Sequence, residues 1–180
     1  MMNTRIATLA SLVLVVALGA IAEEAPFFSA LPKIQRDVEQ IRQLAFKSDV
    51  RGATQSAADF RAYLKDSILR QYGEDAGSNY TRALVKLGAL AKSVDFTETI
   101  MKLAESQAVA HYDPKAKTFF LLMTNISADL LGVTASHELC HALQDQHFSL
   151  ENRLRPSGED DKTIAFHAVA EGDATVAGFA

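Results

Sequence analysis

His137-Glu138-Leu139-Cys140-His141 matches the pattern H-E-x-x-H, and this match guides the interpretation of the whole chain. On a helix, residues four apart lie one turn apart on the same side, so both imidazoles can bind a single metal ion. Glu138 is displaced by about 100° from His137 and by about 60° from His141, so it can hold a water beside the ion without being a ligand. Two neutral imidazoles and an open position suit zinc in a hydrolytic site. The pattern therefore predicts a zinc-bearing helix with Glu138 as the catalytic residue.

A catalytic zinc ion usually takes three protein ligands and a water, and two residues compete for the third position. His147 follows His141 at the spacing of the longer pattern H-E-x-x-H-x-x-G-x-x-H. That arrangement needs a sharp turn, and Gln144 replaces the glycine that would allow it. The residues around Gln144 favour helix, so the helix is expected to carry His147 away from the metal.

Glu171 is the preferred third ligand. It lies in the segment 165–175, which is predicted to form a second helix after a loop at 152–162. Along that helix a single stripe holds four residues at helical spacing, namely His167, Glu171, Ala174 and Gly178. Because the last two are small, this face can approach the first helix closely and direct Glu171 at the zinc. The predicted metal ligands are therefore His137, His141 and Glu171.

Other side chains near the motif receive simpler interpretations. Cys140 is expected to be a small buried packing residue, because a thiolate would crowd the histidines. Asp145 and Asp173 are candidates to accept the second N–H of a ligating histidine, with helix-end or solvent-facing roles as the alternative. His167 is assigned either to a supporting role beside the metal or to the core.

The segment His137–Phe148, followed by Glu171-Gly172-Asp173-Ala174-Thr175, resembles the gluzincin type of zincin metallopeptidase. It is most similar to exported bacterial proteins with an H-E-L-x-H-A-L-Q-D-Q stretch and a downstream E-G-D-A. The resemblance covers roughly residues 108–180 and implies the same three ligands and the same glutamate base. It also implies that an edge strand, Thr118–Met123, lies over the active-site helix and pairs with an extended substrate. Larger gluzincins supply a Tyr or His from a later segment to hold the oxyanion, and this chain ends at Ala180, so we expect the natural protein to continue.

Ahead of the motif, the apolar pattern is first helical and then alternating. Residues 32–103 have helical periodicity in four segments, one of them beginning near Ser56. Residues 108–112 and 118–123 then flank a turn-rich stretch and predict a hairpin. His111 is interpreted as a strand-surface residue, and Tyr112 with Asp113 as the entry to the turn. The predicted fold is α+β and predominantly helical, with a small hairpin or sheet over the active-site helix.

The N-terminus has the pattern of an export signal. Residues 6–22 carry no charge, Arg5 precedes them, and Ala20-Ile21-Ala22 supplies the small residues of a cleavage site before Glu23. A retained membrane anchor is the alternative, although the run is short for a bilayer span. The predicted organisation is a signal peptide at 1–22, an N-terminal helical region at 23–106 and a zincin-like catalytic core at 107–180. The mature protein is then secreted or periplasmic, without stable membrane insertion.

Composition excludes several classes of protein. The chain has 180 residues and a net charge of −4, which gives no electrostatic footprint for nucleic acid, and its one cysteine cannot form an internal disulfide. The sequence thus predicts an exported zinc metallopeptidase that acts on a peptide or protein substrate. The alternatives are a non-catalytic zincin-like metal-binding or interaction module of the cell envelope, or a metzincin-like peptidase with His147 as third ligand. Specificity, oligomeric state and the role of the N-terminal helices stay open.

Overall fold

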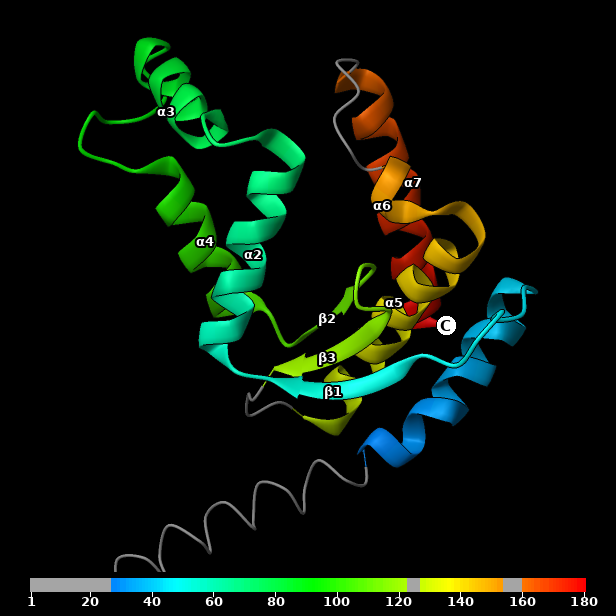
Figure 1. The fold of residues 1–180 in the computed structure, drawn as a ribbon. Coiled ribbons are helices and arrows are strands. Elements are labelled where there is room, and N and C mark those ends of the chain that lie inside the picture. The colour runs from blue at the N-terminus through cyan, green and yellow to red at the C-terminus, as the bar shows by residue number, and fades with distance from the viewer. Residues whose placement is uncertain (1–26, 123–126, 154–159) are drawn as a thin grey trace, which may run out of the picture.

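The computed structural model describes residues 27–122, 127–153 and 160–180, so the predicted signal peptide lies outside the described residues. The first element is a helix over residues 27–42. It is followed in chain order by β1 (Arg51–Gln55), α2 (Ala57–Tyr72), α3 (Ala76–Lys86), α4 (Phe96–Gln107), β2 (Ala110–Asp113), β3 (Thr118–Leu122), α5 (Ala128–Phe148), α6 (Leu150–Arg153) and α7 (Asp160–Phe179) (Figure 1). The fold is α+β and predominantly helical, which confirms that part of the prediction. None of the described helices is long and apolar enough to cross a membrane.

The sheet has the strand order β1-β3-β2. β2 and β3 form the predicted hairpin, with Asp113 opposite Thr118, and β1 pairs in parallel with the other side of β3. Both edges of β3 are therefore occupied, and the prediction that Thr118–Met123 forms the edge strand is wrong for its described residues, Thr118–Leu122; Met123 lies outside them. β2 takes the edge position instead. β1 was not predicted, because it lies within the region expected to be helical.

Side-chain caps begin several of the helices. The Oγ of Ser56 accepts a hydrogen bond from the N–H of Asp59, so α2 begins where the sequence predicts. Asp95 caps α4 in the same way, and Ser127 caps α5. The last of these caps starts the helix that carries the H-E-x-x-H motif, and α5 then continues without a break through His147 to Phe148.

One face of the sheet packs against α5 and the helix over residues 27–42. The buried side chains of this core come from the sheet and from both of these helices. They include Val38, Phe119, Leu121, Leu139 and Leu143. Burying a leucine completely contributes about 1.5–3 kcal/mol, and Leu139 and Leu143 are almost fully enclosed. The N-terminal helix and the motif-bearing helix therefore share one hydrophobic core.

The opposite face of the sheet contacts the α2–α4 arm, which we define as residues 57–107 (Figure 1). His111 of β2 is partly buried there, its ring within 5.4 Å, centroid to centroid, of those of Phe60, Tyr63 and Phe120. Its Nε2–H donates to Oε1 of Gln55 at 2.7 Å. His111 is thus not a strand-surface residue, as interpreted from the sequence, but joins the arm to the sheet.

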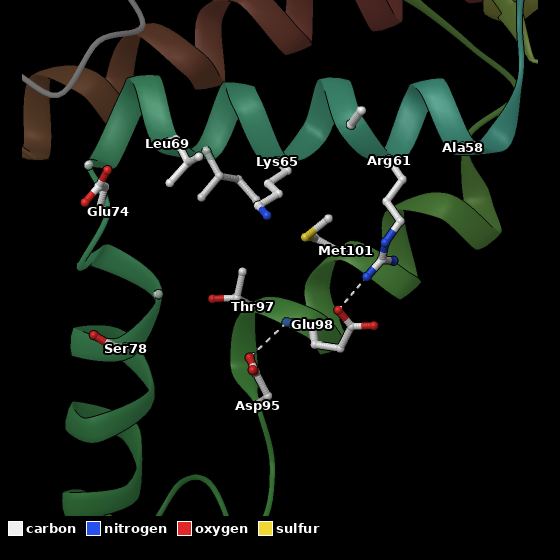
Figure 2. Close-up of a pocket in the computed structure, with 14 residues that line it drawn as sticks. Ala58, Arg61, Lys65, Leu69, Glu74, Ser78, Asp95, Thr97, Glu98 and Met101 are labelled. Carbon is white, nitrogen blue, oxygen red and sulfur yellow. Dashed lines mark hydrogen bonds and ion pairs between the residues drawn. The ribbon is translucent and has the colours of Figure 1, made fainter.

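The arm also has an open pocket of about 510 Å³ between α2, α3 and α4 (Figure 2). Arg61 lies at one end of this pocket, where its guanidinium pairs with Glu98 and Glu105. The pocket shares no residue with α5 or α7, so it is separate from the motif that dominates the sequence.

The buried position of His111 predicts a pH-dependent stability. Burial lowers the pKa of His111 from 6.5 to about 4, whereas an unfolded histidine keeps its ordinary pKa. The unfolded chain therefore takes up the proton first as the pH falls. The stabilisation from neutral His111, at most about 3 kcal/mol, is complete above pH 6.5 and is lost as the pH falls towards 4.

His111→Phe is the matched variant, because it keeps an aromatic ring in place and removes the titration. We expect the urea midpoint of the wild type to fall more steeply between pH 7 and pH 5 than that of the variant. Identical pH dependence of the two proteins would contradict the assignment.

Candidate metal centre

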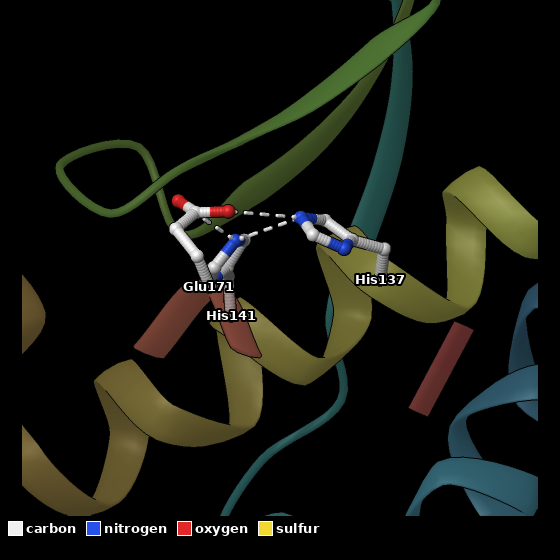
Figure 3. A group of neighbouring side chains, drawn as sticks. All are labelled: His137, His141 and Glu171. Carbon is white, nitrogen blue, oxygen red and sulfur yellow. Dashed lines mark hydrogen bonds and ion pairs between the residues drawn. The ribbon is translucent and has the colours of Figure 1, made fainter. Parts of the chain in front are cut away.

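The structure brings His137, His141 and Glu171 together, and they are the one such cluster among the described residues (Figure 3). One ligand atom from each lies within 4.8 Å of those of the other two. The two Nε2 atoms are 3.1 Å apart, and the carboxylate oxygens of Glu171 are 3.3 Å from His137 Nε2 and 3.6 Å from His141 Nε2. All three predicted ligands therefore point at a common position.

These separations fit a tetrahedral zinc site. With zinc–ligand bonds of about 2.0–2.1 Å, the edges of the tetrahedron are about 3.3 Å long, close to the distance between the two Nε2 atoms and to the distance from Glu171 Oε2 to His137 Nε2. His141 Nδ1 lies 2.9 Å from Oε1 of Gln144, an oxygen that can only accept, so in the neutral ring the proton is on Nδ1 and the lone pair is on Nε2. Lone pairs facing one another repel unless a proton or a metal ion lies between them.

Two helices position the ligands. The helical spacing on α5 stacks His137 and His141, whose rings meet edge to face. Glu171 comes from α7, which packs closely on α5 because Ala174 and Ala177 are small and buried. A Cβ atom at Gly178 would lie 3.0 Å from the carbonyl oxygen of Val133. The small stripe predicted from the sequence therefore does allow the close approach, whereas Gly172 has open space around it and no packing role.

The charge distribution of the cluster favours the binding of a cation. Hydrogen bonds with His137 and His141 hold the pKa of the Glu171 carboxyl well below its usual range. Burial alone would lower the pKa of His141, but its hydrogen bond with Glu171 and the charge of Glu138 raise that pKa overall. The Glu171 side chain is 58% exposed, so one side of the cluster is open to solvent.

Glu138 lies between the histidines and the edge of the sheet. Its Oε2 accepts the backbone N–H of Tyr112 at 2.9 Å. Burial raises the pKa of Glu138, and the nearby histidines oppose that rise without cancelling it. Glu138 is therefore a carboxylate held next to the ligand cluster with a raised pKa, which suits a group that accepts and returns a proton.

The bond to Glu138 follows from the register of the hairpin. The N–H of Leu122 donates to the carbonyl of Val109, so residues 109 and 111 direct their backbone groups towards β3. The alternating residues, Ala110 and Tyr112, then direct theirs to the outer edge. No described strand pairs with that edge of β2, and Glu138 is bonded to it.

Tyr112 was not predicted as a site residue, although the structure gives it two contacts with α5. Besides the bond to Glu138, its hydroxyl donates to Asp145 Oδ2 at 2.9 Å. Asp145 is buried and also pairs with Lys117 in the hairpin turn. Asp145 thus anchors the hairpin on α5 and does not bond a ligating histidine. Asp113 does have the predicted turn role, because its side chain accepts the N–H of Lys115.

The remaining candidates lie outside the ligand cluster. His147 Nε2 is 2.8 Å from the carbonyl oxygen of Ala45, so it faces the N-terminal segment and not the other histidines. Cys140 is fully buried, as expected, and burial together with Asp173 raises the pKa of its thiol to about 12. His167 is partly buried on α7 and is not part of the cluster.

Comparisons of the chain with protein-family models, with curated proteins and with solved structures find no match. The gluzincin resemblance is therefore a prediction from the motifs alone. The function has to be inferred from the chemistry of the site.

The two candidate third ligands can be separated by metal binding. We expect Glu171→Ala to weaken zinc binding by more than about 100-fold, beyond the usual effect of a group that only supports a ligand. His147→Ala should change zinc affinity by less than about threefold, because His147 is bonded to the carbonyl of Ala45. Competition with a chromophoric chelator measures both constants. The reverse order of the two losses would show that His147 is the ligand.

Proposed function

We propose that this protein is a zinc-dependent metallopeptidase with a zincin-like core. The observation that carries the proposal is the convergence of His137, His141 and Glu171, with Glu138 held beside them. Two imidazole nitrogens and one carboxylate oxygen are the donor set of hydrolytic zinc sites, and they leave a fourth position for water. A cluster built for calcium or magnesium would offer mainly oxygen ligands.

When bound, zinc supplies a Lewis acid that polarises a carbonyl and lowers the pKa of its water. Among the residues of the chain, Glu138 has the main chemical role. Its carboxylate accepts the proton of the attacking water and delivers it to the leaving amine. Burial raises the pKa of this carboxyl above the ordinary value of a glutamate. The N–H of Tyr112 holds the carboxylate in place for these transfers.

The free edge of β2 is the surface on which we place an extended peptide. The outward C=O groups of Ala110 and Tyr112 and the outward N–H of Ala110 can pair with a substrate backbone as a further strand, while the N–H of Tyr112 stays bonded to Glu138. Such pairing reads backbone and not side chains, so it suits a peptide or protein substrate without strong sequence preference. This places on β2 the role that the sequence analysis gave to Thr118–Met123.

The alternatives are less well supported. A non-catalytic metal-binding module has no use for a carboxylate with a raised pKa beside the ligands, and Glu138 is such a group. A metzincin-like site needs His147 in the cluster, and His147 is bonded elsewhere. The uncharged segment at residues 6–22 supports export, so we place the activity in the periplasm or outside the cell.

Removing the proton acceptor should abolish turnover and leave the metal site intact. We expect Glu138→Gln to keep zinc affinity within a few-fold and to lower kcat by about 10²–10⁴, because the amide cannot take the proton of the water. A peptide-library assay that is sensitive to a chelator measures activity, and metal analysis measures zinc content.

Glu39→Gln is the matched control. Like Glu138, Glu39 accepts a backbone N–H, that of Phe46 at 2.6 Å, but it is not part of the cluster. Its replacement should leave kcat unchanged. If Glu138→Gln cleaved peptides as fast as the wild type, Glu138 would not be the base.

Strand pairing at β2 predicts a sensitivity to backbone methylation of the substrate. In a cleaved peptide, N-methylation of single residues removes one donor at a time. We expect kcat/KM to fall about fivefold or more at alternate positions, because each lost hydrogen bond costs about 1 kcal/mol and only every second N–H faces β2. A uniform effect along the peptide would argue against pairing at this edge.

A further inference from the structure

We propose that Gln144 is a positioning residue that fixes the ring of His141 for metal binding, and that Asp173 and Arg42 hold Gln144 in place. The inference rests on the proposed metal site, and it assigns a role in that site to residues on three different helices. In the sequence, Gln144 is notable only as the residue that replaces a glycine, and Asp145 and Asp173 are candidates to contact a ligating histidine, with helix-end or solvent-facing roles as the alternative.

The amide of Gln144 has only one orientation that satisfies its surroundings. Its Nε2 donates to the carbonyl of Ala170 at 3.0 Å and to Oδ2 of Asp173 at 2.8 Å, and both of these groups can only accept. The side chain is buried, so water does not compete for these bonds. Oε1 must therefore point the other way, to Nδ1 of His141 at 2.9 Å.

This orientation selects the tautomer of His141. Oε1 has no hydrogen to donate, so the ring nitrogen that faces it must carry the proton. In the neutral ring Nε2 then keeps its lone pair, and it faces Nε2 of His137 and the carboxylate of Glu171. A neutral imidazole without this partner samples both tautomers, and only one of them can bind a metal through Nε2.

Asp173 connects this arrangement to the N-terminal part of the chain. One of its oxygens accepts from Gln144, and the other pairs with the guanidinium of Arg42. Arg42 is the last residue of the helix over residues 27–42. Cys140 also directs its sulfur at Asp173, at 3.6 Å, and as a protonated thiol it adds a weak donor. The N-terminal helix thus contributes to the ordering of a ligand that lies about a hundred residues later in the chain.

A second glutamine on α5 shows that this role is specific to position 144. Gln146 is also bonded through both ends of its amide, because its Oε1 accepts the N–H groups of Lys47 and Ser48 and its Nε2 donates to the carbonyl of Ser48. Those bonds fasten a loop to α5 and involve no histidine. Gln146 is therefore a control of the same residue type, on the same helix, with a purely structural role.

The test combines zinc affinity with the ring tautomer of His141. Long-range ¹⁵N–¹H spectra of the metal-free protein at pH 9 report which ring nitrogen carries the proton. We expect the Nδ1–H form in the wild type and in Gln146→Leu, and a mixture in Gln144→Leu. Zinc affinity, measured by chelator competition, should fall about 10–100-fold in Gln144→Leu and stay within about threefold of wild type in Gln146→Leu.

Two further variants extend the test. Gln144→Glu combined with Asp173→Asn keeps an acceptor facing His141 without placing two carboxylates together, so it should restore the Nδ1–H form. If Gln144→Leu does not fold, Asp173→Leu frees the amide from its other side and should also weaken zinc binding.

The outcomes are distinct. If the Nδ1–H form and zinc affinity survive in Gln144→Leu, the positioning role is wrong. If the wild type binds no zinc, the proposed metal site fails, and the tautomer spectra of the metal-free protein still decide whether Gln144 orders His141.

Discussion

Gly178 of α7 lies so close to α5 that a Cβ atom there would sit 3.0 Å from the carbonyl oxygen of Val133 and 3.5 Å from Cβ of His137. The buried alanines at 174 and 177 continue the same contact. Glutamate has a short reach, so Glu171 can meet the histidines only if the two helix axes approach to this degree. A larger side chain at Gly178 would push against backbone, which cannot yield as a flexible side chain can. The small stripe on α7 is thus a requirement of the ligand cluster and not only a way to fill the core.

The hairpin meets the same helix from another side. Asp145 is buried and receives both the hydroxyl of Tyr112 and the ammonium of Lys117, which fixes the height of β2 over α5. With β2 at that height, the N–H of Tyr112 reaches Glu138. An unpaired buried carboxylate would be costly, so Asp145 is tolerated because two donors satisfy it. The position of the proposed base therefore depends on contacts made about two helical turns away from it.

The features that the sequence predicts well are those with a local physical cause. The spacing of His137 and His141, the cap at Ser56 and the turn between β2 and β3 each depend on residues near one another in the chain. The stripe on α7 also has a local signature, although its partner helix does not. β1 was missed because Arg51–Gln55 has little apolar alternation, and its place is set by pairing with β3 more than sixty residues later. The contact from Tyr112 to Glu138 was missed because a backbone N–H carries no signature in the sequence.

The helix over residues 27–42 contacts α5 and α7, which lie about a hundred residues later in the chain, and these contacts bear on its role. From the sequence, a helical region ahead of the motif is compatible with a prodomain, a lid or part of the substrate cleft. In the structure this helix shares the core of α5 through Val38, and its last residue, Arg42, pairs with Asp173. A prodomain that leaves on activation would expose the buried Val38 surface and strip Asp173 of its counter-charge beside the ligand cluster. The segment that ends at Arg42 is therefore better understood as part of the framework of the site, and the α2–α4 arm, which contacts the opposite face of the sheet, is the part that remains available for other roles.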